Sequence, residues 1–194
     1  MRKKTAIRFA GTAVFCGIAS TASAHTGLDI SGLTTGLAHP LSGFDHLLAM
    51  LAVGLWASQS GEKKLFILPA AFVLSLALGA SFALIYPFLA MIESGIVASV
   101  LILGLLIALS LKLSALLSLM LTAMFGFLHG YAHSLEMPEA AAPAAYAIGF
   151  LGATIALHLT GIVIGVVMRL RLARSLRAMG LGIAASGFWM ALHL

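Results

Sequence analysis

Apolar residues occupy long runs along the chain, and polar residues fall mainly between the runs. Six such runs lie at about residues 40–57, 65–90, 95–111, 114–133, 143–168 and 175–193. They do not alternate apolar with polar positions, and only helices or closed barrels satisfy their backbone in lipid. The pattern predicts an all-α membrane protein, with about six transmembrane helices in one domain spanning residues 25–194.

The first 24 residues have the form of a cleavable secretory signal peptide. Basic residues precede a short apolar stretch at 9–18, and Ala22-Ser23-Ala24 offers a cleavage site of small residues. An uncleaved first membrane helix is the alternative. Cleavage would leave His25 as the N-terminus, where its amine and imidazole together offer a metal chelate, although an incidental histidine fits equally well.

Composition and charge support a membrane location. The chain of 194 residues is 61% hydrophobic and 9% charged, whereas a soluble domain has about 25% charged residues. The formal net charge is +5, but the basic residues occupy short loops and the N-terminus, which argues against a nucleic-acid partner. Beyond the leader they all fall in the first, third and fifth loops: Lys63, Lys64, Lys112, Arg169, Arg171, Arg174 and Arg177. The positive-inside rule then places these loops in the cytoplasm and the mature N-terminus in the periplasm of a bacterial cytoplasmic membrane.

Three ionisable residues stand at the start of the first apolar run: His39, Asp45 and His46. An ionisable group inside a bilayer costs at least a few kcal/mol, so its presence indicates a function. Because a residue before proline is biased away from helix, we expect the span to begin at Pro40, with Asp45 and His46 in its second turn. The segment containing Gly36 is expected to form a looser outer stretch before it.

A second group closes the fourth run on the same side of the membrane: His129, His133 and Glu136. His129 and His133 are four residues apart and share a helix face. Imidazole and carboxylate groups suit divalent transition metals. The single cysteine, Cys16, lies in the leader, which leaves no thiolate site to the mature chain. The two groups are predicted to be the two halves of one metal site.

Three further residues are weaker metal candidates: His25, Glu93 in the second outer loop, and His158 deep in the fifth run. For His158 the alternative is a hydrogen bond between helices, and for Glu136 it is a solvated loop acid. Glycines at four-residue spacing predict close helix packing in the fourth and fifth runs. They are Gly126, Gly130, Gly161 and Gly165.

Two segments resemble motifs of a known family. His-Pro-Leu-Ser-Gly-Phe-Asp-His at 39–46 resembles the first-helix motif of the HupE/UreJ family of nickel, sometimes cobalt, permeases. Phe-Leu-His-Gly-Tyr-Ala-His-Ser-Leu-Glu at 127–136 resembles the second motif, although Leu128 is inserted and Ser134 replaces a glycine. The likeness extends over the whole mature chain. It implies that His39, Asp45, His46, His129, His133 and Glu136 handle the metal, and that the cargo supplies hydrogenase, urease or corrinoid synthesis.

The residues and the resemblance together predict a permease that moves Ni²⁺, or else Co²⁺, inward through a site open to the periplasm. No catalytic cofactor and no enzymatic activity are expected. A phosphate-binding G-x-x-x-x-G-K-[ST] loop is missing from the sequence, which argues against direct ATP drive by this chain. Two alternatives stay open: a membrane metal-binding or sensor protein without translocation, and an intramembrane metalloenzyme, against which the sequence lacks H-E-x-x-H. The ligand set suits nickel, cobalt and zinc alike.

Overall fold

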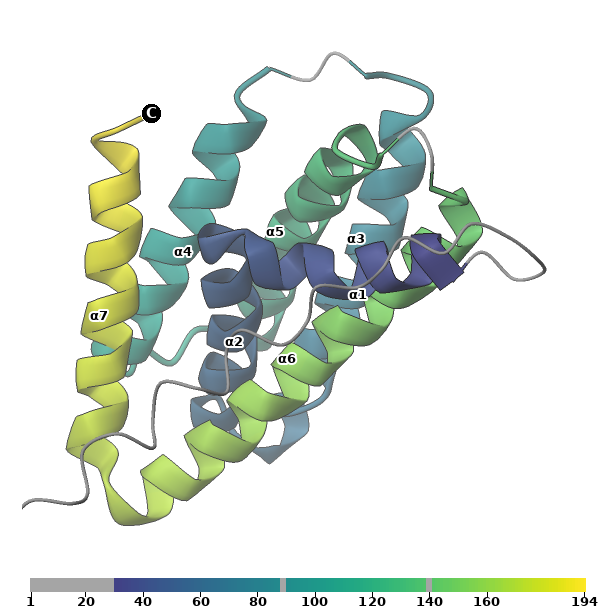
Figure 1. Cartoon of the computed structure of the whole chain (residues 1–194). Helices are drawn as coiled ribbons and strands as arrows, with labels where there is room; N and C mark the ends of the chain where they lie inside the picture. The colour runs from purple at the N-terminus through teal and green to yellow at the C-terminus, as the bar shows by residue number, and fades with distance from the viewer. Residues whose placement is uncertain (1–29, 88–89, 139–140) are drawn as a thin grey trace, which may run out of the picture.

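The computed structural model describes residues 30–87, 90–138 and 141–194; the expected signal peptide and His25 lie outside them. The described residues form seven α-helices and a short 3-10 helix (Figure 1). These are α1 (Ile30–Ser42), α2 (Phe44–Gln59), η1 (Glu62–Lys64), α3 (Ile67–Ala83), α4 (Ile92–Ala108), α5 (Ala115–Leu135), α6 (Pro143–Arg171) and α7 (Ala173–Ala191). The expected all-α class is confirmed.

Each of the six apolar runs contains most of one helix, from α2 to α7, and the first run also includes the end of α1. Three helical segments are long and apolar enough to cross a membrane: Glu62–Ala83, Ala115–Leu135 and Pro143–Leu170. The bent pair of α1 and α2 makes a fourth candidate if it is counted as one span. Helix α4 is apolar but shorter, at 17 residues.

The expected start of the first span is wrong. Pro40 lies inside α1, so His39 is helical, and the segment containing Gly36 is helix instead of a looser stretch. A Cβ placed on Gly36 would overlap the carbonyl of Tyr146, which shows that the backbones of α1 and α6 touch. Burial of α1 against α6 outweighs the local bias of a pre-proline residue. Pro40 lacks the N–H that would bond to the carbonyl of residue 36, and this local cost is offset by the packing of α1 against α6.

The chain bends by 82° between α1 and α2. Gly43, with φ −90° and ψ 115°, lies between the two helices in an extended conformation. Helix α2 therefore begins at Phe44, and Asp45 and His46 lie in its first turn instead of the second. The bend separates His39 on α1 from Asp45 and His46 on α2, although all three come from one short segment.

The helices pack in pairs, with α3 along α5, α4 along α7, and both α1 and α2 along α6 (Figure 1). The predicted glycine contacts are confirmed. A Cβ on Gly126 or Gly130 of α5 would overlap backbone atoms of α3, and one on Gly161 of α6 would overlap the Leu51 carbonyl of α2. A Cβ on Gly165 would overlap Ser58 of α2. Direct backbone contact of this kind fixes each pair tightly.

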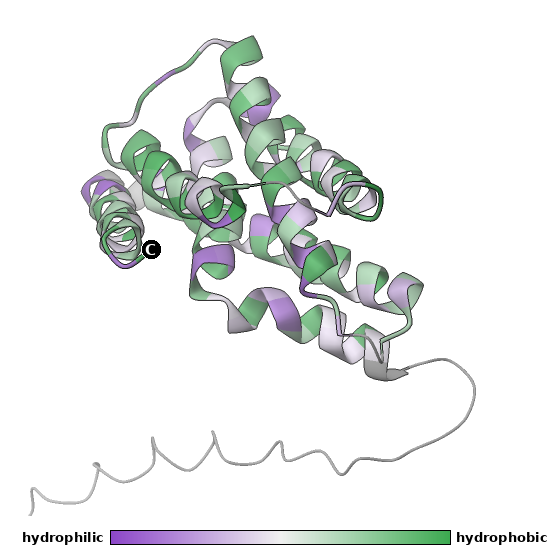
Figure 2. Ribbon diagram, turned by 90° about the horizontal axis from the view of Figure 1, so that it is seen from above, coloured by the Kyte–Doolittle hydropathy of each residue, from purple (hydrophilic) through white to green (hydrophobic). Residues whose placement is uncertain are grey.

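The two ends of the bundle differ. The α2–α3, α4–α5 and α6–α7 connections lie at one end, the lower end in Figure 1, and we call it the basic end because it carries Lys63, Lys64 and Lys112. The last turn of α5 lies at the opposite end. Apolar residues predominate along the helices (Figure 2), and Leu74 and Leu78 face outward with about two-thirds of each residue exposed. Such a surface is typical of a protein surrounded by lipid.

Candidate metal site

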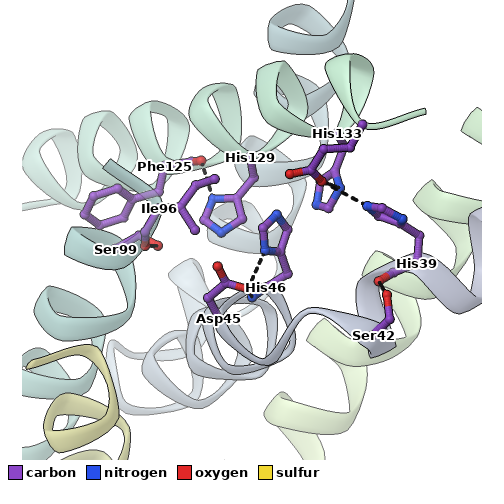
Figure 3. A network of polar contacts seen from close by, with 10 residues as sticks. His39, Ser42, Asp45, His46, Ile96, Ser99, Phe125, His129 and His133 are labelled. Atoms are coloured by element: carbon purple, nitrogen blue, oxygen red, sulfur yellow. Dashed lines mark hydrogen bonds and ion pairs between the residues drawn. The ribbon is translucent and has the colours of Figure 1, made fainter. Parts of the chain in front are cut away.

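The first turn of α2 and the C-terminal half of α5 bring their histidines together (Figure 3). The His46 ring on α2 contacts two rings on α5, with centroid distances of 4.0 Å to His133 and 5.0 Å to His129. Both contacts are edge-to-face. The structure thus brings the two predicted groups of residues to one place, although they lie far apart in the sequence.

An outer cluster consists of His39, His133 and Glu136. The Nε2 atom of His39 donates to Oε2 of Glu136 at 3.1 Å, and Nδ1 of His133 lies 3.4 Å from the same oxygen. One ligand atom from each of the three residues lies within 4.8 Å of the others, so together they can hold a metal ion. Two imidazoles and a carboxylate form a ligand set for a divalent transition metal.

Glu136 supplies the negative charge of the outer cluster. It follows the last residue of α5, and its side chain is 43% exposed. The close contact with His133 and the hydrogen bond from His39 hold the pKa of Glu136 well below its usual range. The carboxylate therefore stays ionised under mildly acidic conditions, and it can attract a cation at the protein surface.

An inner pair consists of His46 and His129. The Nδ1 atom of His46 donates to Oδ1 of Asp45 at 2.8 Å, and Nδ1 of His129 donates to the Phe125 carbonyl at 2.9 Å. Carboxylate and carbonyl oxygens only accept, so each Nδ1 carries the proton and each Nε2 presents a lone pair. Neither Nε2 has a hydrogen-bond partner within the described part of the chain. Metal-ligating histidines typically have this arrangement, with the second nitrogen held by a carboxylate or carbonyl.

The four imidazoles form a continuous imidazole column: His39, His133, His46 and His129, in order of contact. The His39 and His133 centroids lie 4.7 Å apart, and His46 continues the series. The His39 side chain is 22% exposed, whereas the other three imidazoles are buried and His129 is fully enclosed. The column therefore leads from the surface to the dry interior of the bundle.

The weaker candidates lie apart from the outer cluster. Glu93 is exposed in the first turn of α4, and His25 precedes the described residues. His158 on α6 is buried, and its Nδ1 donates to the Met50 carbonyl of α2 at 2.7 Å. The hydrogen bond between helices that was the alternative for His158 is thus confirmed.

Three aromatic residues that flank the imidazoles were not predicted from the sequence. Phe150 lies 4.1 Å from His133 between ring centroids, and Phe72 lies 5.4 Å from His129. Tyr146 lies 5.8 Å from His39. An aromatic residue in an apolar run indicates packing, and only the tertiary structure shows which ring contacts a histidine. These rings cover the imidazoles with apolar surface and so limit the access of water.

The chain is similar to known proteins over most of its length. The chain matches the family model described as HupE / UreJ protein over residues 13–190. It is similar to Protein HupE of Rhizobium leguminosarum bv. viciae, with 40% identity over 143 residues, which are 74% of this chain and 75% of that protein. No solved structure matches the chain. The matched region of the family model includes the outer cluster and the inner pair.

Proposed function

The chain belongs to the HupE/UreJ family, and we propose that it is a permease carrying Ni²⁺, with Co²⁺ as the next candidate, inward across the cytoplasmic membrane. One observation supports this proposal above the others. A series of touching imidazoles runs from a partly exposed carboxylate, Glu136, to a fully buried histidine, His129. A site that only captured metal would not need ligands at successive depths.

Capture begins at the outer cluster. The ionised Glu136 attracts the hydrated cation, and His39 and His133 replace part of its water. In the metal-free protein the Nε2–H of His39 donates a hydrogen bond to the carboxylate, so a metal that binds Nε2 must displace this proton. Binding at this point is consequently a competition between the metal and protons.

Transfer inward uses His133, which belongs to the outer cluster and also contacts His46. An ion held by His133 can gain the Nε2 lone pair of His46, and then that of His129, as it loses its outer ligands. Exchange of one ligand at a time keeps the free-energy change of each step small. Transport requires this because the site must both bind the ion and release it. Asp45, at the positive end of α2, offsets part of the charge of the cation.

The proposed orientation follows from the charges of the two ends. With the basic end in the cytoplasm, the outer cluster opens toward the periplasm. We propose that α2 to α7 form the six spans and that the leader is removed. The family resemblance further suggests that the imported metal supplies hydrogenase, urease or corrinoid synthesis.

Accumulation of radioactive nickel and cobalt by cells expressing the chain tests this function. The variant His46→Ala removes the imidazole of the inner pair that contacts the outer cluster. The matched control is His193→Ala, which removes an exposed imidazole near the C-terminus whose Nδ1 donates to the Trp189 carbonyl. We expect the wild type and the control to accumulate metal, and His46→Ala to fall by at least about ten-fold.

Equal accumulation by the wild type and His46→Ala would refute the proposal. A wild type that binds metal after purification but neither accumulates nor exports it in cells would instead be a binding or sensor protein. Efflux from preloaded cells decides the direction of transport.

A further inference from the structure

We propose that His158 is a deeper metal ligand, which the cargo reaches from the inner pair past the ring of Phe72. This inference rests on the proposed permease function. It adds to the pathway one further binding position, or station, on α6. The other binding positions lie on α1, α2 and α5.

The first argument is an unsatisfied nitrogen. His158 is 1% exposed, and its Nδ1 donates to the Met50 carbonyl at 2.7 Å. Its Nε2 is buried and has no partner among the described residues. Leaving a buried acceptor unpaired is destabilising, and the hydrogen bond to Met50 requires only a donor. The hydrogen bond between helices therefore accounts for Nδ1 of His158. It does not account for a buried Nε2 that has no partner.

The second argument is the likeness between His158 and the inner pair. In His46, His129 and His158 alike, Nδ1 donates to an oxygen that only accepts, and a buried Nε2 carries the lone pair. This fixed tautomer lets Nε2 bind a cation without first losing a proton. Among the described histidines, these three share a buried Nε2 prepared in this way.

The third argument is the position of Phe72 on α3. Its ring centroid lies 5.4 Å from that of His129 and 5.0 Å from that of His158, with an edge-to-face angle of 86° to the latter. One aromatic ring therefore contacts both the last imidazole of the column and the next buried one. The face of an aromatic ring attracts cations, so Phe72 can separate the two stations without repelling the cargo.

The backbone holds His158 at this depth. A Cβ on Gly54 of α2 would overlap the carbonyl of His158, and one on Gly161 of α6 would overlap that of Leu51. Helices α2 and α6 are thus in direct contact around His158, and its ring is buried between them.

The test compares His158→Asn with the matched control His193→Asn. An asparagine amide can keep the hydrogen bond to the Met50 carbonyl, but it lacks the imidazole lone pair. Purified proteins are assayed for Ni²⁺ affinity in detergent and for Ni²⁺ uptake into proteoliposomes. We expect His158→Asn to bind Ni²⁺ within about two-fold of the wild type and to transport it at least about ten-fold more slowly, with the control unchanged. If His158→Asn does not fold, His158→Gln carries the same comparison.

The outcomes separate the two proposals. Uptake by His158→Asn within two-fold of the wild type would overturn the deeper station and leave the permease function intact. Equal losses of affinity and uptake would also overturn it, because His158 would then act in the initial binding of the metal. A wild type that takes up no Ni²⁺ would overturn both.

Discussion

The pairing of Asp45 with His46 leads to a quantitative prediction. Oδ1 of Asp45 accepts from the backbone N–H and from Nδ1 of His46, each at 2.8 Å. The substitution Asp45→Asn keeps the shape of the side chain and removes its charge. It also allows an amide N–H to face Nδ1, which would favour the tautomer that protonates Nε2. We expect Asp45→Asn to weaken metal binding through His46.

The size of the effect follows from the geometry. Loss of a group that holds a metal-ligating histidine costs about 10- to 100-fold in affinity, or about 1.4 to 2.8 kcal/mol. The side chain of Asp45 is 25% exposed, so water partly screens the interaction. We therefore expect the lower part of that range, a loss of about ten-fold.

The assay is Ni²⁺ affinity of the purified protein in detergent, measured by competition with a chelator of known affinity. The variants Asp45→Asn and His46→Ala and their double variant form a thermodynamic cycle, with Glu62→Gln at the basic end as the control. If Asp45 acts by positioning His46, adding Asp45→Asn to His46→Ala changes affinity by less than about two-fold. Fully additive losses would refute this reasoning and make Asp45 an independent ligand.

Two further predictions concern packing and pH. Gly130→Ala places a Cβ against the Leu76 carbonyl, so we expect a loss of about 1–3 kcal/mol of stability. Thermal unfolding in detergent measures it against Gly182→Ala, whose Cβ meets nothing within 4 Å; equal unfolding temperatures would contradict the described α3–α5 contact. Uptake should fall as the pH is lowered, because protons compete with the metal for imidazole while the lowered pKa of Glu136 keeps its carboxylate ionised. Glu136→Gln removes the negative charge beside these imidazoles, so the midpoint of this acid loss should stay or move to lower pH. An upward shift in proteoliposome assays would disprove the explanation.

The sequence predicted the helices better than their ends. Uninterrupted apolar runs indicate α2 to α7 because a backbone in lipid must satisfy its own hydrogen bonds. Helix α1 was missed because Gly36 and Pro40 both disfavour helix locally, whereas contact with α6 stabilises it. A contact between distant segments leaves no trace in local propensity.

The candidate site shows the same limit. The motifs predicted its six residues, since each is a costly polar group near an apolar run. Their order from the surface inward depends on how α1, α2 and α5 meet, and neither motif contains that information. The contacts of Phe72 with His129 and His158 were equally hidden, because phenylalanine is ordinary in a membrane helix.

The glycine contacts have a mechanical consequence. They join α3 to α5 in one unit and join α1 and α2 to α6 in another. The imidazole column crosses the interface between these two units. His129 and His133 belong to the α3–α5 unit, whereas His39 and His46 belong to the unit that contains α6. A shift of one unit against the other would change the distances between ligands and leave the glycine contacts within each unit intact. Such a rigid-body shift would weaken the binding of an ion without unfolding either helix assembly.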